Sequence, residues 1–213
     1  MRPSPFCYWL IFLLMPIYGA LAQENGIGGN LVSGKALYAV CAGCHDLQAQ
    51  GNQDVSAPKL AGQEPWYLTR QLAYYQAGVR GGDPADSHGA RMAVMSLALP
   101  TERAVEDVVA YIQTLPDTVP QPTITGDVAN GRDLFAICSA CHGSQGEGNV
   151  ALSAPRLIRM DDWYLLTQLE AYLDGTRGTH RDDVYGQQMV PTMGALTNEQ
   201  AVRDVVAYIT SLN

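Results

Sequence analysis

Two cysteines three positions apart, followed directly by a histidine, occur twice in this chain. The residues are Cys41, Cys44 and His45 in the first copy and Cys138, Cys141 and His142 in the second. On a helix, side chains three positions apart lie on one face, so both cysteines can reach the edge of one planar ligand. The histidine lies about 100° further round the helix and can place its imidazole over the face of that ligand. This spacing is typical of covalent attachment of haem c through two thioether bonds, with the histidine as an iron ligand.

Paired cysteines also occur in other kinds of site. A thioredoxin-like redox centre needs strands around its Cys-x-x-Cys motif, and the sequence shows no alternating strand pattern. A zinc site would close with four ligands, but each cysteine pair lies inside its own complete repeat, 97 residues from the other. A structural disulfide would leave both histidines without a role. The sequence therefore favours two haem c groups over these three kinds of site.

The repeat extends far beyond the cysteine motifs, at a constant offset of 97 residues and without an insertion. Matching pairs include Gly34 and Gly131, Pro58 and Pro155, Trp66 to Leu68 and Trp163 to Leu165, Arg80 and Arg177, Met92 and Met189, and Asp107 to Ile112 and Asp204 to Ile209. The chain therefore consists of two copies of one small domain. We predict a signal peptide at residues 1–22, a first domain at 23–115, a proline-rich linker at 116–125 and a second domain at 126–213.

The spacing of apolar residues predicts an all-α fold. A middle helix in each copy is indicated by Leu68, Leu72 and Tyr75 and by Leu165, Leu169 and Tyr172. Ser33 and Asn130 are expected to cap the first helix of each copy. The last helix is expected to begin at Thr101 and at Thr197, where Gln200 completes a capping box. The remaining glycine-rich segments are predicted to be loops, which need a large group at the domain centre to pack against.

Methionine is the predicted second ligand of each iron. Its soft, neutral thioether favours reduced iron, as an electron-transfer haem requires. Met92 and Met189 obey the repeat offset, and each is expected in a loop that folds over the haem face opposite the histidine. Met95, Met193 and Met160 have no methionine at the matching position and are interpreted as packing residues.

Other polar groups near the motifs have simpler predicted roles. Pro58 and Pro155 each follow the motif histidine by 13 residues, and their carbonyl groups are candidate acceptors for the second ring N–H of that histidine. The alternative for both prolines is a simple turn. His88 and His180 do not match each other in the repeat and are expected to be solvated.

The N-terminal segment has the pattern of a secretory signal. Arg2 precedes an apolar run from Phe6 to Tyr18, and Ala20 and Ala22 form a small-residue cleavage site. Retention as an anchor helix is the alternative, but an apolar segment that contains Pro16 is short for a span of about 20 residues. We therefore expect export to a bacterial periplasm, with membrane association only if the segment is retained.

The overall charge limits the kind of partner. The formal net charge is -8 at pH 7, which argues against nucleic acid, because nucleic-acid binding depends on Lys and Arg contacts to phosphate. An acidic surface suits a basic protein partner instead. The hydrophobic content of 47% is sufficient for a packed core.

With these motifs the chain resembles the class I c-type cytochromes, and as a duplicated protein it is similar to the di-haem cytochrome c4 family. The resemblance implies two tandem cytochrome c domains, each wrapped around a covalent haem. It also implies that the first and last helices of each domain cross through a glycine and aromatic residues, which here are Gly34, Tyr38 and Tyr111, and Gly131, Phe135 and Tyr208. The segment from Arg156 to Met160 departs from its counterpart in the first copy.

The resemblance implies an electron carrier, not an enzyme, that works between a cytochrome bc complex and a terminal oxidase. One alternative is a fixed electron-transfer subunit of a membrane oxidase complex, tethered by an uncleaved N-terminus. Another is a di-haem peroxidase-like enzyme with one open haem. The matching methionines in both copies argue against the peroxidase-like enzyme.

Overall fold

The computed structural model describes residues 28–213. The signal peptide predicted at residues 1–22 lies outside the described residues. The first half contains α1 (Leu31–His45), η1 (Gln53–Val55), α2 (Pro65–Gln76), α3 (Ser87–Ser96) and α4 (Glu102–Ile112). The second half contains α5 (Val128–His142), η2 (Val150–Leu152), α6 (Asp162–Asp174), α7 (Val184–Met189), η3 (Val190–Ala195) and α8 (Glu199–Ser211). Over residues 28–213 the pairing of extended segments is limited to isolated bridges, so the predicted all-α fold is confirmed.

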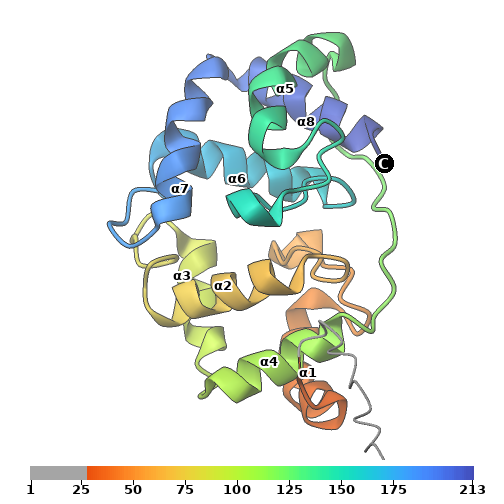
Figure 1. The fold of residues 1–213 in the computed structure, drawn as a ribbon, viewed down its shortest axis with the longest axis vertical. Coiled ribbons are helices and arrows are strands. Elements are labelled where there is room, and N and C mark those ends of the chain that lie inside the picture. Colours follow the sequence, from red (N-terminus) through yellow and green to blue (C-terminus); the bar gives the residue numbers. More distant parts are fainter. Residues whose placement is uncertain (1–27) are drawn as a thin grey trace, which may run out of the picture.

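The two halves are stacked with α2 facing α6 (Figure 1). Arginines just after α2 and α6 bond to the opposite helix across this interface, as in the hydrogen bonds from Arg80 to Gln168 of α6 and from Arg177 to Tyr67 of α2. The chain between α4 and α5 contains no helix and runs along one side of the molecule (Figure 1). The proline-rich linker predicted here is thus an extended segment that joins the two halves.

The first and last helices of each half cross at very short range. At the crossing, a Cβ atom added to Gly34 would overlap the backbone carbonyl of Asp107, and one added to Gly131 would overlap that of Asp204. Aromatic pairs close the same crossings, with ring centroids 5.5 Å apart for Tyr38 and Tyr111 and 5.3 Å apart for Phe135 and Tyr208. Glycine is required there because any side chain would push the two helices apart. The expected crossing is confirmed in both halves.

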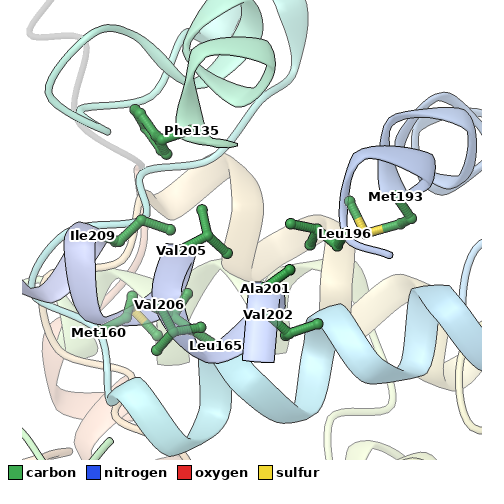
Figure 2. Close-up of a cluster of buried hydrophobic side chains, with 10 residues drawn as sticks. All are labelled: Phe135, Met160, Leu165, Met193, Leu196, Ala201, Val202, Val205, Val206 and Ile209. Carbon is green, nitrogen blue, oxygen red and sulfur yellow. The ribbon is translucent and has the colours of Figure 1, made fainter. Parts of the chain in front are cut away.

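The apolar face of each last helix forms most of the core. In the second half, Val202, Val205, Val206 and Ile209 of α8 lie among the buried side chains of Figure 2, with Phe135 of α5 and Leu165 of α6. Partly buried Cys138 and Met189 pack against this cluster. The core therefore continues directly into the region where the motif residues lie.

The residues that cap the first helix of each half lie at matching positions of the repeat, and they differ from the caps that were predicted. The caps of α1 and α5 are Asn30 and Asp127, whose side chains accept backbone N–H groups, so the predictions of Ser33 and Asn130 were wrong. Ser33 lies inside the first turn of α1, and its N–H donates to the Asn30 side chain at 3.1 Å. Asn30 and Asp127 are 97 residues apart, so they are the positions that the repeat itself preserves.

The residues that cap the last helices, α4 and α8, also lie at matching positions of the repeat. Thr101 caps α4 as expected, by accepting the N–H of Ala104. The cap of α8 is Asn198, not Thr197, and the predicted capping box is absent because the Gln200 side chain donates to Asp204 instead. Asn198 is the residue 97 positions after Thr101.

The segment before each last helix is helical, although it was predicted to be a loop. Asp86 caps α3 by accepting the N–H of Gly89 at 2.7 Å, and Asp183 caps α7 by accepting the N–H of Gly186 at 2.8 Å. These caps stabilise helices whose glycine content hides the apolar pattern. Met92 therefore lies within α3, and Met189 is the last residue of α7.

A cluster of charges ties the linker to both halves. Asp117 of the linker lies 2.5 Å from the ammonium nitrogen of Lys59, 3.1 Å from Arg156 and 3.0 Å from Arg159. The backbone N–H of Lys59 also donates to the Asp161 carboxylate of the second half at 2.8 Å. Burial alone would raise the pKa of Asp117, but the neighbouring cations hold it below its usual value. Burial lowers the pKa of Lys59, although Asp117 opposes this shift.

We predict that Asp117→Asn lowers the free energy of unfolding by about 2–4 kcal/mol at neutral pH, because the buried Lys59 ammonium loses its carboxylate. The contribution of Asp117 is present above its ordinary pKa of about 3.9 and is lost as the pH falls through its lower folded-state pKa. Urea denaturation of the haem-loaded protein, followed by circular dichroism at pH 7 and at pH 3, measures this.

Asp133→Asn is the matched control, because Asp133 and its partner Arg132 are 75% and 66% exposed. This exposed pair is expected to contribute less than about 1 kcal/mol. Equal denaturation midpoints for the two variants at pH 7 would contradict the role given to Asp117.

A second prediction concerns the helix crossing. Gly34→Ala forces α1 away from the Asp107 carbonyl and is expected to cost about 1–3 kcal/mol or more. Gly43→Ala in the same helix is the control, since a Cβ there meets no atom within 4 Å and Ala140 occupies the matching position of the second half. Thermal unfolding of both haem-loaded variants tests this, and similar losses at the two glycines would show that the close crossing is unimportant.

Candidate haem sites

Each half contains a cavity region that brings its cysteine–histidine motif and one methionine together. In the first half, two hollows share Cys41, His45 and Met92 among their lining residues, and Cys44 lines the smaller one. In the second half, one cavity is lined by Cys138, Cys141, His142 and Met189. The structure thus gathers all eight of the predicted site residues into two equivalent groups, one in each half.

The motif histidines are held in one orientation. The Nδ1 atoms of His45 and His142 donate to the carbonyl oxygens of Pro58 and Pro155, and both distances are 2.7 Å. Since a carbonyl group only accepts, Nδ1 carries the proton, and the lone pair of Nε2 is available to a metal. Burial lowers the pKa of both imidazoles, although the proline carbonyls oppose this shift. The predicted proline acceptors are confirmed.

A tight turn places each proline carbonyl. In the first half, the backbone N–H and C=O groups of Asn52 and Ala57 exchange two hydrogen bonds of 2.7 and 3.0 Å. The short helix η1 forms the turn between these two residues. Ser56 within this turn has a positive φ of 56°, and Ser153 has the same conformation in the second half. This turn reverses the chain just before the proline and brings its carbonyl back to the histidine.

The methionines differ in their surroundings. Met92 and Met189 are half-buried and line the cavities beside His45 and His142. Met193 is 3% exposed and packs in the core of the second half, as does Met160, in agreement with their interpretation as packing residues. Met95 lines the smaller hollow and is 42% exposed, so its interpretation as a core residue was wrong.

The other histidines are exposed, as expected. His88 lies in the first turn of α3, and His180 lies in the loop before α7. His180 Nδ1 accepts the N–H of Asp182 at 3.2 Å, and His88 Nδ1 lies 3.1 Å from the Arg91 side chain. Neither ring is held by a buried acceptor like those of the motif histidines.

The half-buried cysteine of each motif, Cys41 or Cys138, is unsuited to disulfide exchange because burial raises the pKa of its thiol. All four are free, and burial raises the pKa of the Cys138 thiol to about 11, whereas a reactive thiol needs a lowered pKa. The two pairs lie in separate halves, so they do not form one four-cysteine site. Between residues 28 and 213, no three His, Cys, Asp or Glu side chains are grouped to hold a metal ion.

The second cavity fits a haem c group. It has an empty volume of about 1340 Å³, including the part open to solvent. Its apolar walls include Leu157, Leu165, Leu169, Leu196, Val205 and Ile209. Buried Nε atoms of Arg70, Arg156 and Arg177, which also line it, have no hydrogen-bond partner within the part of the chain that the structure describes. A planar apolar ring system with thiol-reactive edges and carboxylate substituents suits these walls, and once bound it supplies one-electron chemistry.

A polar network joins the two cavities across the interface. It consists of three repeat-related pairs, which are Tyr67 and Tyr164, Gln71 and Gln168, and Arg80 and Arg177. Arg80 donates to Gln71 at 2.7 Å within its own half and to Gln168 at 2.6 Å in the other. Arg177 makes the equivalent bonds to Gln168 at 2.6 Å and to Gln71 at 3.2 Å. All three pairs obey the 97-residue offset of the repeat, but their spacing in the sequence gives no sign that they meet.

No helix within residues 28–213 has both the length and the apolar character needed to cross a bilayer.

A protein-family model described as cytochrome c matches the chain twice, over residues 31–116 and 128–213. The matched segments begin at the first residues of α1 and α5. Each half of the chain therefore matches the cytochrome c family by itself.

Several known proteins are similar over most of the chain. Cytochrome c4 of Azotobacter vinelandii is 29% identical over 196 residues, which cover 87% of this chain and 90% of that protein. The crystal structure of reduced cytochrome c4 from Pseudomonas stutzeri superposes with a TM-score of 0.65 at 26% identity, and covers 87% of this chain and all of that one. A thiosulfate dehydrogenase electron acceptor of Thiomonas intermedia is 29% identical over 149 residues, which cover 65% of each protein.

Proposed function

We propose that this chain, which belongs to the cytochrome c family and binds two haem c groups covalently, is a periplasmic electron carrier of a respiratory chain with two His/Met-ligated haems. The observation that carries the proposal is the matched pair of sites, each of which brings the attachment cysteines, an oriented histidine and a methionine together, around one cavity in the second half and around two adjoining hollows in the first. We assign haem attachment to Cys41, Cys44, Cys138 and Cys141, and iron ligation to His45, Met92, His142 and Met189.

In each site the imidazole ring of the histidine is held in one orientation and in its neutral form. The Pro58 and Pro155 carbonyls orient the rings and raise their basicity toward iron. A thioether on the opposite face stabilises the ferrous state and raises the reduction potential. Two closed, rigid sites of this kind suit outer-sphere electron transfer, in which no substrate binds at the iron.

Partial exposure of the motif cysteines supports a route for electrons at the protein surface. Cys44 and Cys141 are exposed, whereas Cys41 and Cys138 are half-buried. The attached edge of each haem is thus placed near the surface, where a partner can approach it. The two cavities meet on the other side at the network around Arg80 and Arg177, so that electrons can pass between the haems inside the molecule.

A cytochrome bc complex as donor and a terminal oxidase as acceptor are the proposed partners, in line with the resemblance to cytochromes c4. Export by the segment at residues 1–22 would place the protein in the periplasm with them. A fixed subunit of a membrane oxidase complex is the alternative if that segment is retained, and mass spectrometry of the native N-terminus distinguishes the two.

A second candidate donor is thiosulfate dehydrogenase. Two relatives are named as electron acceptors of that enzyme, at 29% and 27% identity. A thiosulfate dehydrogenase structure from Marichromatium purpuratum also superposes with a TM-score of 0.65, although this chain covers only 40% of it. Comparing the rates at which a purified bc complex and a purified thiosulfate dehydrogenase reduce the protein would decide between the donors.

The axial methionines give the sharpest test. Met92→Ala and Met189→Ala are each expected to remove half of the weak sulfur-to-iron absorption band of the oxidised protein. Each is also expected to allow CO to bind to one reduced haem, because one iron loses its thioether ligand, and to lower the potential of that haem. The measurements are visible absorption of the oxidised protein and a CO titration of the reduced protein.

Met95→Ala and Met193→Ala are the matched controls. Met193→Ala removes a buried side chain and is expected to cost about 2–5 kcal/mol of stability with the absorption band intact. Loss of half the band in either control, with an intact band in Met92→Ala or Met189→Ala, would show that the ligands are assigned wrongly.

Charge gives a further test of the carrier function. Without residues 1–22 the chain loses Arg2 and becomes more acidic than the -8 of the full sequence. Electron exchange with a basic protein partner is expected to slow as salt rises, since exposed charges are screened beyond about 10 Å at 0.1 M. Stopped-flow rates over a range of ionic strength measure this, with an uncharged small reductant as the control. A rate with the basic partner that stays constant would point to an apolar docking surface.

A further inference from the structure

Arg70 belongs to the first half of the chain, but it lines the cavity of the second. It lies on α2, and the cavity that it lines contains Cys138, His142 and Met189. Its guanidinium group donates to the carbonyl oxygen of Ser153 at 3.0 Å. The Arg70 side chain therefore reaches across the interface to the wall of the other half's site.

Aromatic rings from both halves hold the Arg70 guanidinium in this position. Its central carbon lies 4.3 Å from the ring centroid of Tyr185 on α7 and 4.8 Å from that of Trp66 on α2. Cation–π contacts of this kind stabilise the charged group when it is withdrawn from water. They also hold the guanidinium group in one orientation, whereas a freely solvated arginine side chain would adopt many.

Three half-buried arginines line this cavity, and few carboxylates there are free to pair with them. Arg70, Arg156 and Arg177 line it, and the buried Nε of each has no hydrogen-bond partner in the described part of the chain. Glu64 and Asp183 also line the cavity, but Glu64 accepts the backbone N–H of Arg156 and Asp183 that of Gly186, at 2.8 Å in both cases.

Of the three arginines, only Arg156 pairs with a carboxylate, that of Asp117, within residues 28–213. A buried polar N–H group without a partner is costly, and Arg70 and Arg177 have no paired carboxylate, so an anionic group bound in this cavity would be stabilised. Haem c has two propionate carboxylates, and a guanidinium group pairs with a carboxylate through two parallel hydrogen bonds.

The repeat shows that Arg70 is specific to the second site. Arg177 has a counterpart in Arg80, and both take part in the network between the halves. The residue 97 positions after Arg70 is Thr167, which lines the first cavity and is exposed and uncharged. An arginine therefore crosses the interface toward the second site, and an uncharged residue occupies the equivalent position at the first.

We propose that Arg70 is a binding residue of the second haem, supplied by the first domain, and that with Arg177 it pairs with the propionate groups of that haem. The haem site of the second domain is then complete only when the two domains are in contact. A cation next to a haem favours the ferrous state, whose charge is less positive, so Arg70 raises the potential of the second haem.

Arg70→Thr, which copies the second half, tests the proposal in the haem-loaded protein. The readout is a redox titration followed by NMR, in which amide resonances of α1 and α5 report separately on the two haems. We expect the midpoint seen by α5 to fall while the midpoint seen by α1 stays within error. Arg70→Lys keeps the charge and is expected to shift the α5 midpoint less. Thr167→Arg places a cation at the first site and is expected to raise the α1 midpoint.

Arg181→Thr is the control for net charge, because Arg181 has an 89% exposed side chain in the second half. It is expected to leave both midpoints unchanged. The proposal is overturned if Arg70→Thr leaves the α5 midpoint unchanged, if it shifts both midpoints equally, or if Arg181→Thr gives the same shift. These outcomes concern the haem environment alone, so they are independent of the donor and acceptor and of which methionines ligate the iron.

Discussion

The close crossing of the first and last helices is the constraint on which each half of this molecule depends. Gly34 and Gly131 allow α1 and α5 to lie directly against the backbone of α4 and α8. The crossing fixes the helix that bears the cysteines and the histidine relative to the helix that supplies the core. Because the attachment residues follow the glycine on the same helix, the crossing also sets their position relative to the apolar wall. The proline turn and the methionine helix then close the remaining sides of the cavity.

Much of the site could be predicted from the sequence, because its parts are local motifs repeated at a fixed offset. The cysteine–histidine motif and the proline carbonyl both lie within one short stretch, and the structure confirms the hydrogen bond from His45 to Pro58. Helix starts were predicted less well, since Asn30 and Ser33 are both good caps and composition alone does not separate them. The helix that bears Met92 was missed because glycine and polar residues hide its apolar pattern.

Contacts between the halves could not be predicted, because nothing in local spacing shows which residues meet across an interface. Arg156 and Arg159 looked like a departure from the repeat, and the structure explains them through Asp117, which lies in the linker between the two copies. The two copies keep the same residues where each must hold a haem. At the interface they keep the network around Arg80 and Arg177 but differ at other positions, as with Lys59 and Arg156 or Arg70 and Thr167.

This division has a physical consequence for how the molecule works. A symmetric dimer of identical domains would give both haems the same surroundings, and electrons would have no preferred site. Fusion of the copies allows each half to present different residues to its neighbour, so that two similar cavities differ in the charges contributed across the interface. The buried polar groups there need both halves to satisfy their hydrogen bonds, since Arg80 and Arg177 each bond to glutamines of both domains. Separation of the halves would expose these bonds to water and remove the cross-domain charges together. The arrangement of the domains and the environment of the haems are therefore set by the same residues.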